Sequence, residues 1–301
     1  MRSQLTLAAS MMIFGTIGIF VKNIPLSSGE IALFRAMIAA TSIAIFQWIS
    51  GKRSPLSAFR REIPLLFLSG AAIGLNWMLL FEAYRYTTVS VATLCYYFAP
   101  VIVTALCPLL FKERLTLMRL VCFALSTVGL LLVVGADGDG GGSNQLVGIL
   151  LGLGAAVLYS AVILINKSLQ TVGNIDRTLW QFIAAIVVLA PYVAMTSGIH
   201  PLAAGGFGLL NLLVLGVCHT GITYCLYFSS LKNMPGQEAA LLSYLDPLVA
   251  VFVSVVILGE TLTPMQGFGG SLILGFTLLN ELWSMRSRRL PTHVKEPSNP
   301  I

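Results

Sequence analysis

Charged residues are scarce in this chain. Asp, Glu, Lys and Arg make up 10% of its 301 residues, whereas a typical globular domain carries roughly 25%. So little charge cannot cover the water-facing surface of a protein of this size, which excludes an ordinary soluble protein. Intrinsic disorder needs low hydrophobicity, yet 56% of the residues are hydrophobic. The mean hydropathy of +0.87 indicates that the chain folds in lipid.

Histidine and paired cysteines are also in short supply. The chain has three histidines, and its five cysteines form no CxxC pair and lie inside apolar runs, where cysteine behaves as a small hydrophobe. HExxH, GxSxG and Walker-type phosphate loops are absent from the sequence. We therefore expect no disulfide framework, no metal, no cofactor, no enzymatic activity and no direct coupling to ATP in this chain.

Long apolar runs are what the sequence has in abundance. A membrane-spanning helix needs about 20 apolar residues to cross a hydrocarbon core of ~30 Å. Ten apolar runs remain when the chain is divided at charged residues, at Gly and Pro, and at polar loops. They lie near residues 4–22, 31–50, 64–84, 88–110, 117–135, 146–167, 178–197, 206–229, 237–258 and 264–284. Continuous runs of this length fit helices, because barrel strands alternate over about ten residues. The predicted fold is an all-α protein with ten transmembrane helices.

The basic residues set the predicted orientation. In a soluble chain, the net charge of +6 would indicate nucleic acid as a partner, but here the cations lie in short loops between apolar runs. With the N-terminus inside, fifteen of the eighteen Lys and Arg face the cytoplasm, Lys22 and Arg85 face outside, and Arg35 lies within a span. This bias follows the positive-inside rule. We expect a multi-pass protein of the bacterial cytoplasmic membrane with both termini in the cytoplasm and no nucleic-acid partner.

The two halves of the chain resemble each other. At an offset of 147 residues the pattern P-x12-E-x-L-T-x-M occurs twice without a gap, from Pro100 to Met118 and from Pro247 to Met265. Further matches are Ala92/Ala239, Leu94/Leu241, Tyr97/Tyr244 and Leu125/Leu272. Each half holds five predicted spans, and this odd number places the second half upside down relative to the first. Inverted repeats are typical of secondary transporters, which bind substrate near the midplane between the halves.

The repeat predicts the domain organisation. The expected parts are a first repeat (1–136), a glycine-rich outer linker (137–145), a second repeat (146–285) and a basic cytoplasmic tail (286–301).

Two blocks carry a family resemblance. FEAYRYTTVSVATLCYYFAPVIVTALCPLLFKERLT (81–116) and PGQEAALLSYLDPLVAVFVSVVILGETLT (235–263) resemble the EamA repeats of the drug/metabolite transporter superfamily, and Arg35 in ALFRAMIAA fits the same pattern. The resemblance covers essentially the whole chain. It implies two inverted five-helix repeats, a central cavity lined by spans 1, 3, 4, 6, 8 and 9, and alternating access. It implies a substrate among amino acids, nucleotide-related metabolites, vitamins, quaternary amines and drugs, without choosing one.

Ionisable residues inside spans are the first functional candidates, because burying them in a membrane is costly. Asp246 lies midway along the ninth run, directly before Pro247, and its counterpart in the first half is Ala99. We expect Asp246 to bind substrate or a proton; the alternative is a carboxylate that caps hydroxyls or pairs with a buried cation. His219 lies midway along the eighth run and can titrate near neutral pH, although a neutral packing histidine is the alternative.

A polar face on the eighth span follows from helical spacing. His219, Thr223 and Tyr227 are spaced i, i+4, i+8 and would share one face, which we expect to line the cavity.

Arg35 and Glu82 are further candidates for coupling or gating. Arg35 could clamp a substrate carboxylate, reach to the interface, or pair with Glu30 or Glu82. Glu82 is spaced i, i+3 from Arg85, so a surface pair is the alternative for this acid.

Polar and aromatic residues complete the predicted lining. They are Asn76, Trp77, Tyr96, Tyr97, Tyr159, Ser160, Asn166 and Tyr244. Aromatic rings can hold a planar substrate or a cation. Pro100 and Pro247, matched in the repeat, are expected to bend their helices, either as gating hinges or as static kinks.

The sequence as a whole predicts a secondary active transporter. We expect export of a small organic metabolite such as an amino acid or amine by alternating access, with protons as the candidate coupling ion. The alternatives are a passive uniporter of the same solutes and a multidrug, quaternary-amine or vitamin transporter. The expected partners are the solute and the lipid bilayer, with no obligate protein partner.

Overall fold

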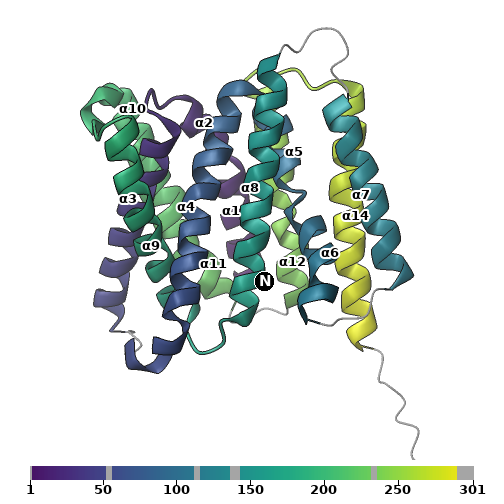
Figure 1. The fold of residues 1–301 in the computed structure, drawn as a ribbon, viewed down its shortest axis with the longest axis horizontal. Helices are drawn as coiled ribbons and strands as arrows, with labels where there is room; N and C mark the ends of the chain where they lie inside the picture. Colours follow the sequence, from purple (N-terminus) through teal and green to yellow (C-terminus); the bar gives the residue numbers. More distant parts are fainter. Residues whose placement is uncertain (1, 52–55, 112–115, 136–142, 232–235, 290–301) are drawn as a thin grey trace, which may run out of the picture.

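The computed structural model describes residues 2–51, 56–111, 116–135, 143–231 and 236–289. Helices that lie roughly side by side make up this part of the chain (Figure 1). Eight stretches are long and apolar enough to cross a membrane, and Leu241–Val256 is a shorter apolar helix. Each of the ten predicted runs coincides with helix, which confirms an all-α polytopic membrane protein.

The helices follow the chain in simple order. Their bounds are α1 Arg2–Gly15, α2 Ile17–Lys22, α3 Ser28–Ser50, η1 Leu56–Glu62, α4 Ile63–Tyr86, α5 Val89–Tyr96, α6 Ala99–Phe111, α7 Leu117–Gly135, α8 Ser143–Ser168, α9 Asn174–Thr196, η2 Pro201–Ala204, α10 Gly205–Val214, η3 Leu215–Ile222, α11 Thr223–Leu231, α12 Gly236–Ser243, α13 Leu245–Val256 and α14 Pro264–Arg289. We call the side where α1 begins and α14 ends the termini side (Figure 1). The opposite side, where α7 ends and α8 begins, is the linker side.

Two boundaries differ from the expected domain limits. The predicted linker, 137–145, overlaps α8, which begins at Ser143, and residues 136–142 lie outside the described part of the chain. The predicted tail, 286–301, overlaps α14, which continues to Arg289. Residues 290–301 lie outside the described part.

The fourth and ninth spans are broken at matched positions. The fourth span divides into α5 and α6 at Tyr97–Phe98, and the ninth divides into α12 and α13 at Tyr244. Tyr97 and Tyr244 are matched in the repeat, and each lies three residues before a proline. A proline ring clashes with the carbonyl four residues earlier, so Pro100 and Pro247 account for both breaks. The helices are therefore interrupted close to the prolines at which bends were expected.

The packing pairs corresponding helices of the two halves. The second span packs on the seventh (α3 on α9), the fourth on the ninth (α5 on α13) and the fifth on the tenth (α7 on α14). The third span also packs on the sixth (α4 on α8), and the first packs on the eighth (α1 on α11). When the two halves are exchanged, the first three pairs map onto themselves and the last two map onto each other, as an inverted repeat requires.

Small residues bring paired helices into close contact. Gly129 of α7 faces Gly269 of α14, and a Cβ added at Gly129 would lie 2.6 Å from the Gly269 carbonyl oxygen. Small residues are typical of such membrane-helix interfaces, because apolar side chains gain little from leaving lipid. The fifth and tenth spans therefore form a tight pair at one end of the bundle (Figure 1).

Candidate functional site

A cavity of about 610 Å³ lies between the two halves. Its walls come from α1, α2, α3, α4, α5, α6, α8, α9, α11, α12, α13 and α14. On the termini side it reaches Asn174 and Arg177 at the start of α9 and Glu281 near the end of α14. Toward the linker side its lining ends at residues such as Gly18 and Tyr84. This conformation therefore faces the termini side.

Asp246 lies in this cavity at the break of the ninth span. It is the second residue of α13, and its carboxylate accepts a hydrogen bond from the hydroxyl of Tyr97, which lies at the matched break of the fourth span. Its backbone packs against α1, since a Cβ added at Gly15 would lie 2.6 Å from the Asp246 carbonyl oxygen. The acid thus joins the broken helices of both halves beside the first span.

Arg35 of α3 is a buried cation in the same cavity. Its side chain is almost fully buried, at 3% exposure, and its Nε donates a hydrogen bond of 2.8 Å to Oγ1 of Thr220 in η3. Its guanidinium carbon lies 4.0 Å from the centre of the Trp77 ring, a cation–π contact. The alternative in which Arg35 pairs with Glu30 or Glu82 does not hold among the described residues. Glu30 caps α3 through Ser27 instead.

Aromatic rings line much of the remaining wall. Tyr96 packs against Tyr159 in a tilted arrangement with ring centres 5.2 Å apart, and it contacts Tyr97 edge to face at 5.6 Å. Trp77 lies against Phe182 at 5.3 Å. Of the predicted lining residues, the cavity brings together Asn76, Trp77, Tyr96, Tyr97, Tyr159, Asn166, Tyr227, Tyr244 and Asp246, together with Arg35 and Pro100.

Several other predicted residues lie outside the cavity lining. Ser160 is buried and donates to the Val157 carbonyl, and Pro247 is buried within α13. Glu82 forms the pair with Arg85 that was the alternative for this acid, at 3.6 Å, and it also accepts a hydrogen bond of 2.6 Å from Ser28.

The eighth span does not present the expected polar face. Residues 215–222 form a π-helix, whose wider turn shifts the side chains away from α-helical register. His219 therefore lies 2.9 Å from the Thr16 hydroxyl and packs against the Phe20 ring. Thr223 donates to the Cys218 carbonyl, and only Tyr227 of the three reaches the cavity.

The structure adds a polar cluster that the sequence analysis missed. Gln181 of α9 donates hydrogen bonds to Ser69 Oγ (2.6 Å) and to Asn166 Oδ1 (2.7 Å), which joins α4, α8 and α9. Arg177, one turn earlier on α9, also lines the cavity and donates to the Leu169 carbonyl. Neither residue is conspicuous in the sequence, because Arg177 directly precedes an apolar run, as loop cations do, and Gln181 carries no charge.

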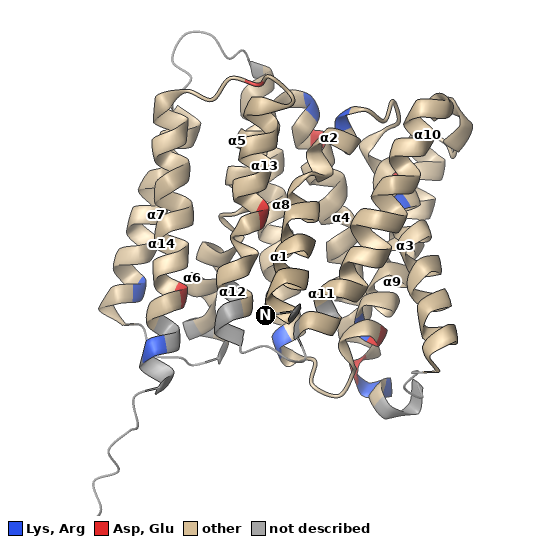
Figure 2. Ribbon diagram, turned by 180° about the vertical axis from the view of Figure 1, so that it is seen from behind, with Lys and Arg blue, Asp and Glu red and all other residues tan. Residues whose placement is uncertain are grey.

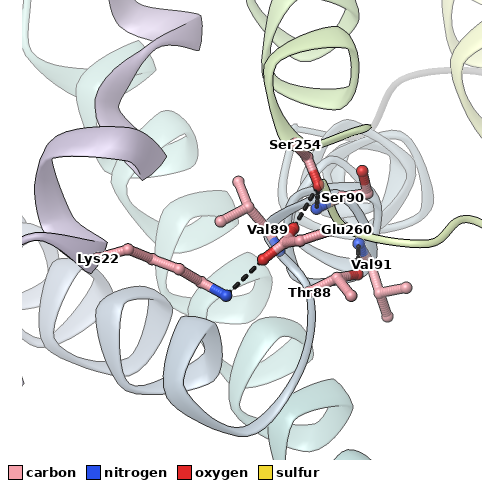
Figure 3. A network of polar contacts seen from close by, with 7 residues as sticks. All are labelled: Lys22, Thr88, Val89, Ser90, Val91, Ser254 and Glu260. Atoms are coloured by element: carbon pink, nitrogen blue, oxygen red, sulfur yellow. Dashed lines mark hydrogen bonds and ion pairs between the residues drawn. The ribbon is translucent and has the colours of Figure 1, made fainter. Parts of the chain in front are cut away.

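A second polar network closes the linker side of the bundle. Glu260, in the connection after α13, pairs with Lys22 at the end of α2 and accepts hydrogen bonds from the Ser254 hydroxyl and the Val89 backbone N–H (Figure 3). Val89 is the first residue of α5, where a helix N-terminus favours negative charge. One carboxylate therefore ties together the linker-side ends of the first, fourth and ninth spans.

Charge elsewhere is arranged as a membrane requires. Lys, Arg, Asp and Glu lie mainly toward the ends of the helices (Figure 2). Within the part of the chain that the structure describes, His, Cys, Asp and Glu form no group of three that could hold a metal ion. The cavity is thus lined by hydrogen-bonding and aromatic groups, with a cation and an acid in its deep part, which suits binding of a small polar organic molecule.

Comparison with known proteins identifies relatives of the whole chain. The EamA-like transporter family matches residues 1–135 and 146–281. An uncharacterized transporter, YxxF of Bacillus subtilis strain 168, is 27% identical over 83% of this chain and 80% of its own length. A protein of Salmonella typhimurium strain LT2 named as a probable amino-acid metabolite efflux pump is 26% identical over 80% of this chain and 87% of its own length. One solved crystal structure shares the fold, with a TM-score of 0.65 at 16% identity over 95% of this chain and 98% of that one.

Proposed function

This chain belongs to the EamA-like transporter family, and from that premise we propose that it is a secondary active exporter of a small organic metabolite. The substrate class we favour is an amino acid or an amine, and the membrane is the cytoplasmic membrane of a bacterium. The name of the Salmonella relative, a probable amino-acid metabolite efflux pump, supports the class. The orientation rests on the cation bias, which puts the termini side in the cytoplasm.

The contact between Asp246 and Tyr97 is the observation that carries this proposal. It joins the breaks of the fourth and ninth spans, one from each half, at a titratable group inside the cavity. When the halves exchange conformations, these breaks must move relative to each other, so the proton on Asp246 and the state of the cavity would change together. Protons are accordingly the coupling ion that we propose.

In this proposal, alternating access depends on contacts on both sides of the cavity. The cavity now faces the termini side, where substrate from the cytoplasm would enter. Opening to the linker side would require the Glu260 network to separate, with the helices bending at the breaks before Pro100 and Pro247. We propose that three predicted residues affect this movement without contacting substrate, because they lie outside the cavity lining. These residues are His219, Thr223 and Glu82.

Flux in proteoliposomes tests the proposal. Purified protein reconstituted with a panel of amino acids and amines should move a substrate faster when a pH gradient is imposed. Asp246→Asn keeps the shape of the side chain and removes its charge, so it should lose the response to the gradient. Asp176→Asn is the matched control, because Asp176 accepts a hydrogen bond from Gln47 away from the cavity lining, and it should transport normally.

Two outcomes would reject parts of the proposal. Flux that is the same with and without a pH gradient would indicate a passive uniporter. Gradient-driven flux that persists in Asp246→Asn would remove this acid from the coupling step.

A further inference from the structure

Arg35 is a buried cation whose charge has no acidic partner in the described part of the chain. The ion pairs found there are Lys22 with Glu260 and Arg85 with Glu82, both near the linker-side ends of the helices. The guanidinium of Arg35 donates through Nε to Thr220, and its two Nη groups have no partner among the described residues. A buried charge without a partner is costly. A guanidinium held in the cavity wall in this way therefore indicates that an anionic group of a ligand binds to it.

The surroundings of Arg35 hold the guanidinium in place. The Trp77 ring lies against it at 4.0 Å, and the Phe81 ring lies at 5.6 Å. With the Nε bond to Thr220, these contacts fix the plane of the group before a ligand arrives. A fixed guanidinium presents two parallel N–H donors that match the geometry of a carboxylate.

Asp246 reaches the same cavity from a different wall. Arg35 lies on α3, against α4 and η3, whereas Asp246 lies on α13, against the fourth span and α1. The two charges share one cavity but do not pair with each other. Tyr97 occupies one oxygen of the carboxylate, Oδ2, and Oδ1 has no partner among the described residues.

We infer that the cavity recognises a zwitterion, with its carboxylate on Arg35, its ammonium on Asp246 and its side chain among the tyrosines and Trp77. This inference rests on the proposed transport function and narrows its substrate class. A simple amine would leave the charge of Arg35 without an opposite charge, and a simple acid would leave the charge of Asp246 without one. Quaternary amines fail for the same reason as simple amines, because they offer no group to the guanidinium.

Binding to sets of matched ligands tests this inference. Each set contains one L-amino acid, the amine that lacks its carboxylate and the acid that lacks its ammonium. Thermal stabilisation of the purified full-length protein measures the affinities, since a ligand of the folded state raises the melting temperature. At least one amino acid should bind about tenfold or more tightly than both of its partial analogues, because each analogue leaves one charge of the cavity without its opposite charge.

Substitutions at Arg35 test the carboxylate end of the ligand. Arg35→Gln should lower the affinity for the amino acid to that of its amine and leave the affinity for the amine unchanged. Arg35→Lys keeps the charge without the fork and should retain part of the preference. If Arg35→Gln does not fold, Thr220→Val loosens the guanidinium at Nε and should weaken the same preference. Arg85→Gln is the matched control, because Arg85 is exposed and lies outside the cavity lining, and it should bind as the parent does.

The inference fails if no amino acid in the panel binds more tightly than its own amine and acid. It also fails if Arg35→Gln leaves the preference for the amino acid intact. Because binding is measured without flux, a zwitterion that binds but does not move with a pH gradient would reject proton-coupled export and keep the inference. Gradient-driven flux of an amine, without any preference for zwitterions, would reject the inference and keep proton-coupled export.

Discussion

At the scale of single residues, the two halves are alike in shape and different in chemistry. Tyr97 and Tyr244 mark equivalent breaks, yet Asp246 has Ala99 as its counterpart. The repeat thus builds two similar bends, and one of them carries a carboxylate that the tyrosine of the other half can reach. An inverted pair of helices brings the tyrosine of the first half to the acid of the second.

Tyr97→Phe tests whether this contact matters for coupling. The change removes the hydroxyl that donates to Asp246 and keeps the ring, so the fold should persist. Loss of a hydrogen bond to a charged group costs about 1.5–3 kcal/mol, and we expect about a tenfold loss of gradient-driven flux and a shifted pH dependence. Flux measured in proteoliposomes across a pH series shows both effects.

Tyr86→Phe is the control for this change. Tyr86 is the last residue of α4, is 41% exposed and lies outside the cavity lining. The flux and pH profile of the Tyr86→Phe protein should therefore match those of the parent. A Tyr97→Phe protein with the parental pH profile would contradict a coupling role for the contact.

At the scale of helices, two different local features interrupt the spans around the cavity. Prolines break the fourth and ninth spans at matched positions, whereas the eighth span contains the π-helix of residues 215–222. Elsewhere the helices are held by close contact, most tightly where α7 meets α14 at Gly129 and Gly269. The interrupted spans and this close pair are therefore separate elements.

Gly269→Ala should lower stability more than a nearby change of the same kind. A Cβ at Gly269 would lie 2.5 Å from the Gly129 carbonyl oxygen, which is backbone and cannot turn aside. Overpacking of this kind costs about 1–3 kcal/mol, so the melting temperature of the purified protein should fall.

Gly275→Ala serves as the comparison in the same helix. A Cβ there would meet nothing within 4 Å, and alanine favours helix over glycine by about 1 kcal/mol, so its melting temperature should be equal or higher. Equal melting temperatures for the two variants would show that α7 and α14 are not tightly packed at this point.

At the scale of the whole molecule, the cavity matches one of the states that the proposed alternating access requires. The cavity reaches the termini side, and Glu260 binds three spans together on the linker side. Its carboxylate is largely shielded, with 11% of the side chain exposed, so the network should be stronger than a typical surface pair. Breaking it should shift the population toward a state open to the linker side.

Glu260→Ala tests this shift through the accessibility of one site. Thr93 of α5 lines the cavity and is 4% exposed. In a background without the native cysteines, a cysteine introduced at Thr93 should react about tenfold faster from the linker side once Glu260 is removed, since the lost contacts bias the equilibrium by one or more kcal/mol.

Glu62→Ala provides the control on the opposite side. Glu62 accepts hydrogen bonds from the backbone N–H groups of Gln170, Thr171 and Val172 on the termini side, so its loss should not speed labelling from the linker side. If both variants label like the parent, the Glu260 network does not hold the linker side closed.

Much of this architecture was predictable from local features of the sequence. Twenty-residue apolar runs must become helices in lipid, because every backbone group needs an internal partner there, and the ten runs do coincide with helix. Prolines act on the helix that contains them, so the breaks near Pro100 and Pro247 followed as well. Asp246, Trp77 and most of the tyrosines lie in the cavity as predicted, because polar groups are costly in lipid and tend to face the interior.

What the tertiary structure decided were contacts between distant segments. Arg35 bonds Thr220, 185 residues away in the chain, instead of the nearby acids, because Glu30 is used in a local cap and Glu82 by Ser28 and Arg85. The π-helix turned His219 toward Thr16 because one wide turn alters the register of every later side chain. Spacing along a helix determines which residues share a face, but only packing determines what that face meets.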